Sequence, residues 1–523
     1  MNGTRSLKLN RRAFVVGMNA LAASLLSCSE AFAVAADVRT SANNLAADPR
    51  RPQFHLLPPA NWMNDPNGPI YWNGNYHMFY QYNPDGAYWG NMHWGHAMSE
   101  DMVHWKHLPV ALSPTPGGPD SAGCFTGTAV VQNGRVELMY TGVRAIPLEQ
   151  ATIKDGNPPL RESQCLAVAN DPELKTWTKV PTPVISNPPS QLEVNGFRDP
   201  SPWRQGDWWY TVLGSGVANR GGAVLLYKSK DLRSWEFMHL LAQRDREGAA
   251  AFDPTDPWDM WECPDFFALG DWKVLICSTL GRSYWRTGKL DPDTMMFHSE
   301  QSGILDYGSY YAPKTHLDHR GNRILWGWVQ EARPVEEYKA AGWAGVMSLP
   351  RVLSVEEDGR LQMRFAPELH SLRRVERQAK ITESETENQR QIASIRFENG
   401  SGEILCTAQR SAGPFQLIVS ALSDHGVPLL ILDFDPSRAT PVSVEAHPIS
   451  VRLGEHEDIE MHLYVDASVI EVLVNGQAAW TKRFYLKGNT APEIGLQWKG
   501  STRSIQKLMA WQIAPISDDR LTT

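Results

Sequence analysis

Short runs of aromatic and β-branched residues, separated by Gly, Pro, Asn and Asp, fill the sequence from about residue 52 to residue 350. Runs such as 69–82, 127–141, 208–213 and 272–280 have the length of strands and almost no helical periodicity. Turn-forming residues between such runs are typical of antiparallel sheets. The pattern therefore predicts an all-β domain over this part of the 523-residue chain.

A weak repeat narrows the architecture. Segments 99–105, 170–177 and 229–235 each place an Asp in a turn shortly before a Trp. Shared turn chemistry alone can produce such a match, because Asp commonly precedes a strand. The three Asp residues are 70 and 60 residues apart. At this period, about 300 residues would form five units of four strands, in which radial repetition protects the strand edges. We therefore predict a five-bladed β-propeller over residues 52–365.

A second domain is expected, because the chain is long enough for two hydrophobic cores. Residues 366–390 are polar and charged, which is typical of a linker or an interdomain helix. Short alternating runs then resume between residues 391 and 515. Seven or more strands in this length predict a C-terminal β-sandwich.

The first 36 residues have the features of an export signal. Four basic residues lead into the apolar stretch 13–26, and the run 10–15 resembles a twin-arginine signal. Small residues allow cleavage after Ala33 or Ala36. We therefore expect the twin-arginine or the general secretory machinery as a partner and a secreted or periplasmic protein without stable membrane insertion. The alternative is a lipid anchor at Cys28, which the sequence 25–28 would allow.

Charge and cysteine spacing exclude several classes of function. The net charge of -8 and the lack of a basic run beyond the signal argue against nucleic acid as a partner. None of the 6 Cys has the spacing of a zinc or redox motif, so we expect mostly free, buried thiols. No nucleotide or metal-ligand motif is present in the sequence, and we expect no cofactor and no metal. The 20 Trp suit a sugar ligand, although many of them must serve as core.

Three segments set a carboxylate in a turn rich in aromatic residues. They are 61–68 with Asp65, 196–200 with Asp199, and 260–265 with Glu262. Each alone could be an ordinary structural turn. Together they meet the needs of retaining glycoside hydrolysis, in which one carboxylate attacks the anomeric carbon and a second carboxyl protonates the leaving oxygen.

The neighbours of each carboxylate suggest its role. Desolvation by Trp261 and Cys263 would raise the pKa of Glu262, as an acid requires. The amide of Asn64 and nearby backbone N–H groups would keep Asp65 ionised as a nucleophile. Arg198 would stabilise the charged form of Asp199, which would then bind sugar hydroxyls.

In these three motifs the chain resembles glycoside hydrolase family 32, the invertases, levanases, inulinases and fructan exohydrolases. The motifs are Trp-Met-Asn-Asp-Pro-Asn-Gly, Arg-Asp-Pro and Glu-Cys-Pro. The resemblance implies a five-bladed propeller joined to a β-sandwich. It also implies that Asp65 is the nucleophile, Asp199 the transition-state stabiliser and Glu262 the acid/base.

The resemblance extends to residues that line the fructose pocket in that family. Phe125-Thr126 stands where the family usually has Phe-Ser, and Tyr311 and Trp328 could equally be core residues. The implied substrate-binding set is Asn64, Gln81, Trp89, Phe125, Thr126, Arg198, Tyr311 and Trp328.

One departure from the family bears on the substrate. Plant relatives that prefer sucrose usually carry an Asp-x-x-Lys element after the Glu-Cys-Pro motif, whereas residues 278–283 contain no acid. We therefore expect an exo-acting, retaining β-fructosidase that releases terminal fructose from levan-type fructans and cuts inulin or sucrose more weakly. The alternatives are an invertase or a fructosyltransferase acting on sucrose and, from another class, a non-catalytic fructan-binding protein.

Overall fold

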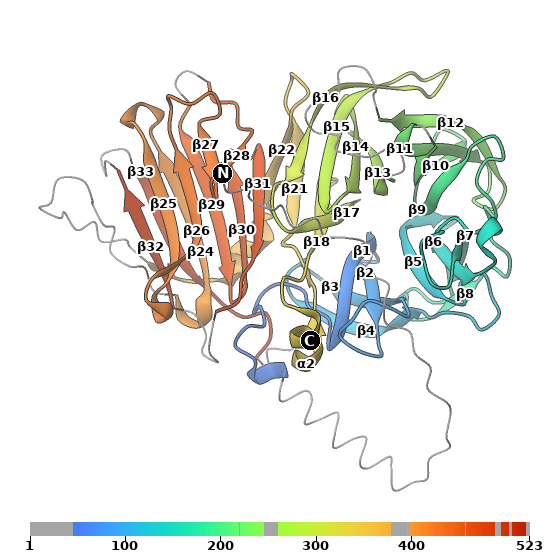
Figure 1. The fold of residues 1–523 in the computed structure, drawn as a ribbon, viewed down its shortest axis with the longest axis horizontal. Coiled ribbons are helices and arrows are strands. Elements are labelled where there is room, and N and C mark those ends of the chain that lie inside the picture. Colours follow the sequence, from blue (N-terminus) through green and yellow to red (C-terminus); the bar gives the residue numbers. More distant parts are fainter. Residues whose placement is uncertain are drawn as a thin grey trace, which may run out of the picture.

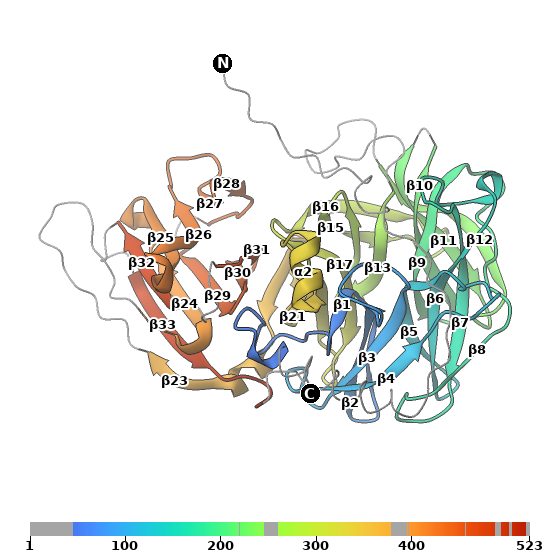
Figure 2. The same ribbon diagram turned by 60° about the horizontal axis from the view of Figure 1, so that its bottom comes forward.

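The protein folds into two all-β domains that lie side by side, as the computed structural model shows (Figures 1 and 2). The structure describes residues 45–218, 220–244, 260–377, 395, 397–454, 457–486, 493–500 and 505–518. Five sheets form the N-terminal domain and two form the C-terminal domain. The predicted β-propeller followed by a β-sandwich is therefore confirmed.

Each propeller blade is an antiparallel sheet whose first strand faces the centre. These first strands, β1, β5, β9, β13 and β17, contact one another in a closed ring. The first two blades contain β1 (Asn61–Trp72), β2 (Asn75–Asn83), β3 (His93–Ser99), β4 (Trp105–Leu112), β5 (Gly123–Gln132), β6 (Arg135–Ala145), β7 (Leu160–Ala169) and β8 (Trp177–Lys179). The third and fourth contain β9 (Val194–Gln205), β10 (Trp208–Val217), β11 (Gly221–Ser229), β12 (Trp235–Gln243), β13 (Glu262–Leu269), β14 (Trp272–Thr279), β15 (Arg282–Leu290) and β16 (Phe297–Asp306). The fifth contains β17 (Tyr310–Leu317), β18 (Arg323–Val329), β20 (Val346–Met347), β21 (Arg351–Val355) and β22 (Leu361–Phe365).

The ring is closed by a short strand that returns from the fifth blade to the first. After β18 the chain forms α2 (Val335–Ala341) and then β19 (Trp343–Ala344), which pairs in parallel with the start of β1. The helix ends at Gly342, whose φ of 73° is the left-handed conformation that favours glycine at this position. The loop between β6 and β7 adds the single turn η2 (Leu148–Gln150).

The Asp-to-Trp repeat is a structural repeat of the blades. In each copy the Asp carboxylate accepts backbone N–H groups of the turn that joins the third strand to the fourth, and the indole N–H donates to a carbonyl within that turn. The three Asp–Trp pairs are Asp101 and Trp105, Asp171 and Trp177, and Asp231 and Trp235. The fourth blade keeps the turn at Asp291 but carries Phe297 in place of the Trp, which weakened the repeat in the sequence.

The C-terminal domain packs two sheets face to face around a core of aliphatic and aromatic side chains. One sheet contains β23 (Arg373–Arg377), β33 (Ile505–Ile513), β24 (Ser401–Ala408), β29 (Ile459–Asp466), β30 (Val469–Val474) and β31 (Ala478–Arg483). The other contains β28 (His447–Ile449), β27 (Val442–Val444), β26 (Val427–Phe434), β25 (Phe415–Ala421) and β32 (Ile494–Lys499). The short 3-10 helices are η3 (Pro367–Leu372), η4 (Glu398–Gly400), η5 (Arg410–Ala412) and η6 (Leu422–Asp424).

The first part of the predicted linker 366–390 is regular structure. Residues 367–372 form η3, and residues 373–377 form β23, which pairs with β33 of the sandwich. The connection between the domains is therefore continuous with the sandwich sheet as far as Arg377. Residues 378–390 and the predicted export signal 1–36 lie outside the described residues.

Buried charges join the two domains. Arg351 of the propeller donates to Asp306 at 2.9 Å and to Glu471 of the sandwich at 2.6 Å, and none of the three side chains is exposed to solvent. His55 lies between Asp466 and Glu471, at 2.7 and 3.1 Å. Because buried charges are stable only when paired, this network holds the domains in one relative orientation.

Candidate active site

A bulge interrupts the first strand of every blade near its start. The pairing shifts beside Asp65 in β1, Thr126 in β5, Asp199 in β9, Cys263 in β13 and Ala312 in β17. In four of the five blades the next residue is Pro, which cannot donate to the ladder. A bulge re-aims the side chains around it. The five bulges therefore direct residues from different blades toward the centre of the ring.

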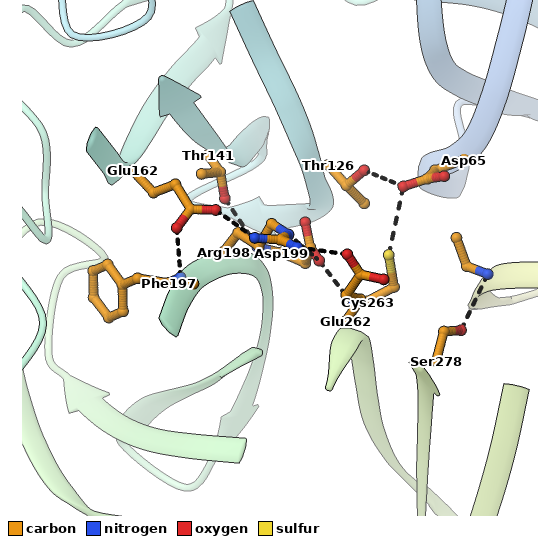
Figure 3. Close-up of polar contacts among 12 residues, drawn as sticks. Asp65, Thr126, Thr141, Glu162, Phe197, Arg198, Asp199, Glu262, Cys263 and Ser278 are labelled. Carbon is orange, nitrogen blue, oxygen red and sulfur yellow. Dashed lines mark hydrogen bonds and ion pairs between the residues drawn. The ribbon is translucent and has the colours of Figure 1, made fainter. Parts of the chain in front are cut away.

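Asp65 lies between donors from two other blades (Figure 3). Its Oδ2 accepts from the Thr126 hydroxyl at 2.6 Å and from the Cys263 thiol at 3.5 Å. Its Oδ1 accepts from the Asn64 amide at 2.9 Å, as predicted, and Asn64 is itself fixed by the indole N–H of Trp62 at 2.8 Å. Burial raises the pKa of Asp65 by more than the Thr126 and Asn64 hydrogen bonds lower it. The predicted backbone donors are wrong, because in the described structure only side chains donate to this carboxylate.

Asp199 is buried at 2% exposure and takes an uncommon left-handed backbone with φ of 65°. Its backbone N–H donates to the Thr141 hydroxyl at 2.9 Å, and its Oδ2 accepts from the Cys263 N–H at 2.8 Å. Burial raises the pKa of Asp199 to about 7, against the attraction of Arg198. Arg198, whose Nε lies 3.8 Å from the carboxylate, favours the charged form as predicted, but desolvation outweighs this effect.

Glu262 begins β13 and keeps a quarter of its side chain exposed. Arg198 donates to its Oε1, and the Tyr311 hydroxyl donates to its Oε2. The predicted rise in the pKa of Glu262 by desolvation stays a prediction. The Trp261 ring packs against Gly222, with the Arg286 guanidinium above it at 4.9 Å.

Glu162, which the sequence analysis did not identify, holds the Arg198 guanidinium in position. Glu162 is fully buried on β7 and accepts from the Arg198 guanidinium at 2.7 Å and from the Phe197 N–H at 2.7 Å. Arg198 thus bridges Glu162 and Glu262. No motif surrounds Glu162 in the sequence, and only its position opposite the Arg-Asp-Pro bulge identifies it.

The predicted aromatic residues form a cluster on the side of Asp65. Trp62 packs edge-on against Trp328 with ring centroids 5.9 Å apart, and Trp89 packs edge-on against Phe125 at 5.8 Å. Phe125, Tyr311 and Trp328 belong to the same packed cluster, while Trp89 is 37% exposed. Gln81 is also buried, and its side-chain amide donates to the Cys124 carbonyl at 2.9 Å.

All eleven predicted site residues therefore lie at the bulged ends of the first strands or beside them. The five Cys of the described part are free and buried, which confirms the expected thiols, and Cys28 lies outside it. Across the described ranges, no group of three or more His, Cys, Asp or Glu side chains is arranged to hold a metal. In the same ranges no helix is long and apolar enough to cross a bilayer.

Two family profiles match this chain over nearly all of the described residues. The glycosyl hydrolases family 32 N-terminal domain matches residues 55–366, and the family 32 C-terminal domain matches residues 368–512.

Relatives and solved structures agree with these profiles. A sucrose-6-phosphate hydrolase of Escherichia coli is 34% identical over 88% of this chain and 94% of its own length, and a raffinose invertase of Escherichia coli is 35% identical over 83% and 89%. The structure of a family 32 β-fructofuranosidase of Bombyx mori has a TM-score of 0.70 at 28% identity and covers 93% of this chain and 99% of its own. That of fructan 1-exohydrolase IIa from Cichorium intybus has a TM-score of 0.70 at 26% identity, over 89% and 98%. This chain belongs to glycosyl hydrolase family 32.

Proposed function

We propose that this protein is a retaining exo-β-fructosidase with Asp65 as nucleophile and Glu262 as acid/base. The observation that carries the proposal is the meeting of Asp65, Asp199 and Glu262 from three different blades, held by Thr126, Arg198 and Tyr311. Family membership supports the same reaction class, as do relatives named sucrose-6-phosphate hydrolase, raffinose invertase and fructan 1-exohydrolase.

The reaction proceeds in two displacements at one carbon. Asp65 attacks the anomeric carbon of the terminal fructose while Glu262 gives a proton to the leaving oxygen. Glu262 then takes a proton from water, which attacks the same carbon and releases Asp65. Two inversions retain the configuration. Asp199 and Arg198 bind hydroxyls of the fructose and hold it in place for both steps.

The proposed substrate preference is for levan-type fructans. Ser278 lies opposite Glu262 in the sheet, so the hairpin 278–283 borders the acid/base. The Ser278 and Ser283 hydroxyls bond each other at 3.0 Å, and the hairpin tip presents Leu280, which is 51% exposed. No carboxylate of this hairpin is available to hold the glucose of sucrose. A site built for one fructose ring favours cleavage from the chain end.

A sucrose hydrolase is the second candidate, because the names of the Escherichia coli relatives point to sucrose 6-phosphate and raffinose as substrates. The test incubates the purified protein separately with levan, inulin, sucrose and sucrose 6-phosphate and follows early products by chromatography. We expect fructose as the main early product, released fastest from levan. Early oligosaccharides would contradict the exo mode, and a large preference for sucrose or its phosphate would make the protein an invertase.

The same assay distinguishes the remaining alternatives. With sucrose, equal release of glucose and fructose indicates hydrolysis, whereas a deficit of fructose indicates a fructosyltransferase. A protein that binds levan and releases no sugar from any of the four substrates would be a fructan-binding protein.

We also propose that the protein is exported to the periplasm or secreted, on the basis of the basic and apolar pattern of residues 1–36. N-terminal sequencing of exported protein is expected to begin at Val34 or Asp37. A mature chain that begins at a lipid-modified Cys28 would replace this proposal by a membrane anchor.

A further inference from the structure

We propose that Lys314 is a positioning residue of the active site, whose buried ammonium is a second counter-charge, after Arg198, that favours the ionised form of Asp199. The inference deepens the proposed function and rests on it. Lys314 contacts neither the predicted nucleophile nor the acid/base through any hydrogen bond in the described structure, and the two-step reaction does not use it.

Lys314 binds the turn of β13 that also binds the Asp199 carboxylate. It follows the β17 bulge and is 1% exposed, and its Nζ donates to the Pro264 carbonyl at 2.9 Å. The residue before Pro264 is Cys263, whose N–H binds the Asp199 carboxylate at 2.8 Å. The ammonium and the carboxylate are therefore attached to the same turn of β13.

Burying an ammonium against a neutral carbonyl is unfavourable unless negative charge lies nearby. Four carboxyl groups meet at this end of the ring, Asp65, Asp199, Glu162 and Glu262. The terminal nitrogens of Arg198 bind the two Glu side chains, and only its Nε, at 3.8 Å, approaches Asp199. Lys314 supplies the second positive charge of the cluster.

The groups that act on the Asp199 carboxylate come from several strands of the ring. Arg198 on β9 and Lys314 on β17 favour its charged form, as does the Cys263 N–H, and Asp65 on β1 opposes it. Burial raises the pKa of the Cys263 thiol, so this group is neutral near pH 7. The Thr141 hydroxyl binds the backbone of Asp199 rather than its carboxylate.

The consequence is a defined pH dependence. Burial already raises the pKa of Asp199 to about 7, and loss of a favourable positive charge would raise it further. If ionised Asp199 is required to hold fructose, activity falls as the pH drops through this pKa. Without the Lys314 charge, that fall would begin at higher pH.

The test measures kcat/KM against pH with the substrate that the wild type cuts best. Lys314→Gln keeps an N–H donor for the Pro264 carbonyl and removes the charge, and Lys314→Arg keeps the charge. We expect Lys314→Gln to shift the acidic limb of this pH profile to higher pH by about one pH unit. At a given pH on that limb, this is roughly a tenfold loss of kcat/KM. Lys314→Arg is expected to keep the wild-type limb. Lys289→Gln is the control, because Lys289 also donates to a backbone carbonyl, that of Asp271 at 2.9 Å, on the surface of the fourth blade.

A folded Lys314→Gln variant with an unshifted limb would overturn the inference. If Lys314→Gln does not fold, the charge argument predicts that adding Asp199→Asn restores folding, and failure to do so would also overturn it. A wild type that cuts no fructoside contradicts the proposed function itself, whereas an active wild type with an unshifted Lys314→Gln variant contradicts this inference alone.

Discussion

Asp65→Asn is expected to lower kcat by about three to five powers of ten on every fructoside that the wild type cuts. The amide has nearly the same shape and can still accept from Thr126, but it cannot form the bond to the anomeric carbon. Glu262→Gln should cause a loss of similar size, because an amide cannot give a proton to the leaving oxygen. The measurement is initial rates of fructose release with purified variants.

Two controls make this result specific. Asp85→Asn changes an exposed carboxylate of the first blade that binds Asn91, outside the proposed chemistry, and is expected to keep near wild-type kcat. Thermal unfolding of Asp65→Asn should remain close to that of the wild type. A folded Asp65→Asn variant with wild-type kcat would remove Asp65 from the reaction.

Arg351→Met is expected to lower the free energy of unfolding by about 3–5 kcal/mol, because it leaves Asp306 buried without its cation and Glu471 with only His55. Both partners and Arg351 itself are fully buried, and Arg351 also donates to the Thr481 hydroxyl at 2.8 Å. Arg360→Met is the control. Arg360 pairs with Asp358 at an exposed site, where an ion pair contributes at most about 1 kcal/mol.

The stability that this interface contributes is expected to fall both at acidic pH and as the pH rises through the raised pKa of His55. Arg351 and His55 lower the pKa of Glu471 below its ordinary 4.5, so its stabilising effect is lost as the pH falls through the lowered value. Asp466 and Glu471 raise the pKa of His55 above 6.5, so its effect is present below 6.5 and lost as the pH rises through the raised value. Denaturant unfolding at several pH values checks both limbs. A wild type whose stability did not change across these ranges, or an Arg351→Met variant as stable as the wild type, would contradict the role of the network.

Features that each lie within one segment could be predicted from the sequence. Strand-length runs predicted the two β domains, and Asp before Trp marked a turn that recurs in successive blades. The Pro after Asp65, Asp199 and Cys263 is a signal in the sequence from which the bulges at the site could have been predicted.

Features that depend on two blades meeting were not predictable in the same way. Glu162 has no motif around it, and its importance comes from Arg198 on a neighbouring strand. Lys314 follows the predicted Tyr311 by three residues, but only the fold shows that it binds the β13 turn that also holds Asp199. The Trp261 ring packs against Gly222 of another blade, a contact that a single segment does not show. The pKa of Asp199 was not predictable for the same reason, because burial by the whole ring outweighs the effect of Arg198, its neighbour in sequence.

The most direct test of the central claim is to trap the covalent intermediate. Glu262→Gln lacks the base that activates water, so a fructosyl donor with a good leaving group should leave fructose attached to the enzyme. Digestion and mass spectrometry are predicted to find the fructosyl group on the peptide that contains Asp65, and only there. A fructosyl group on Asp199, or a wild-type reaction that releases fructose with inverted configuration at the anomeric carbon, would contradict the account.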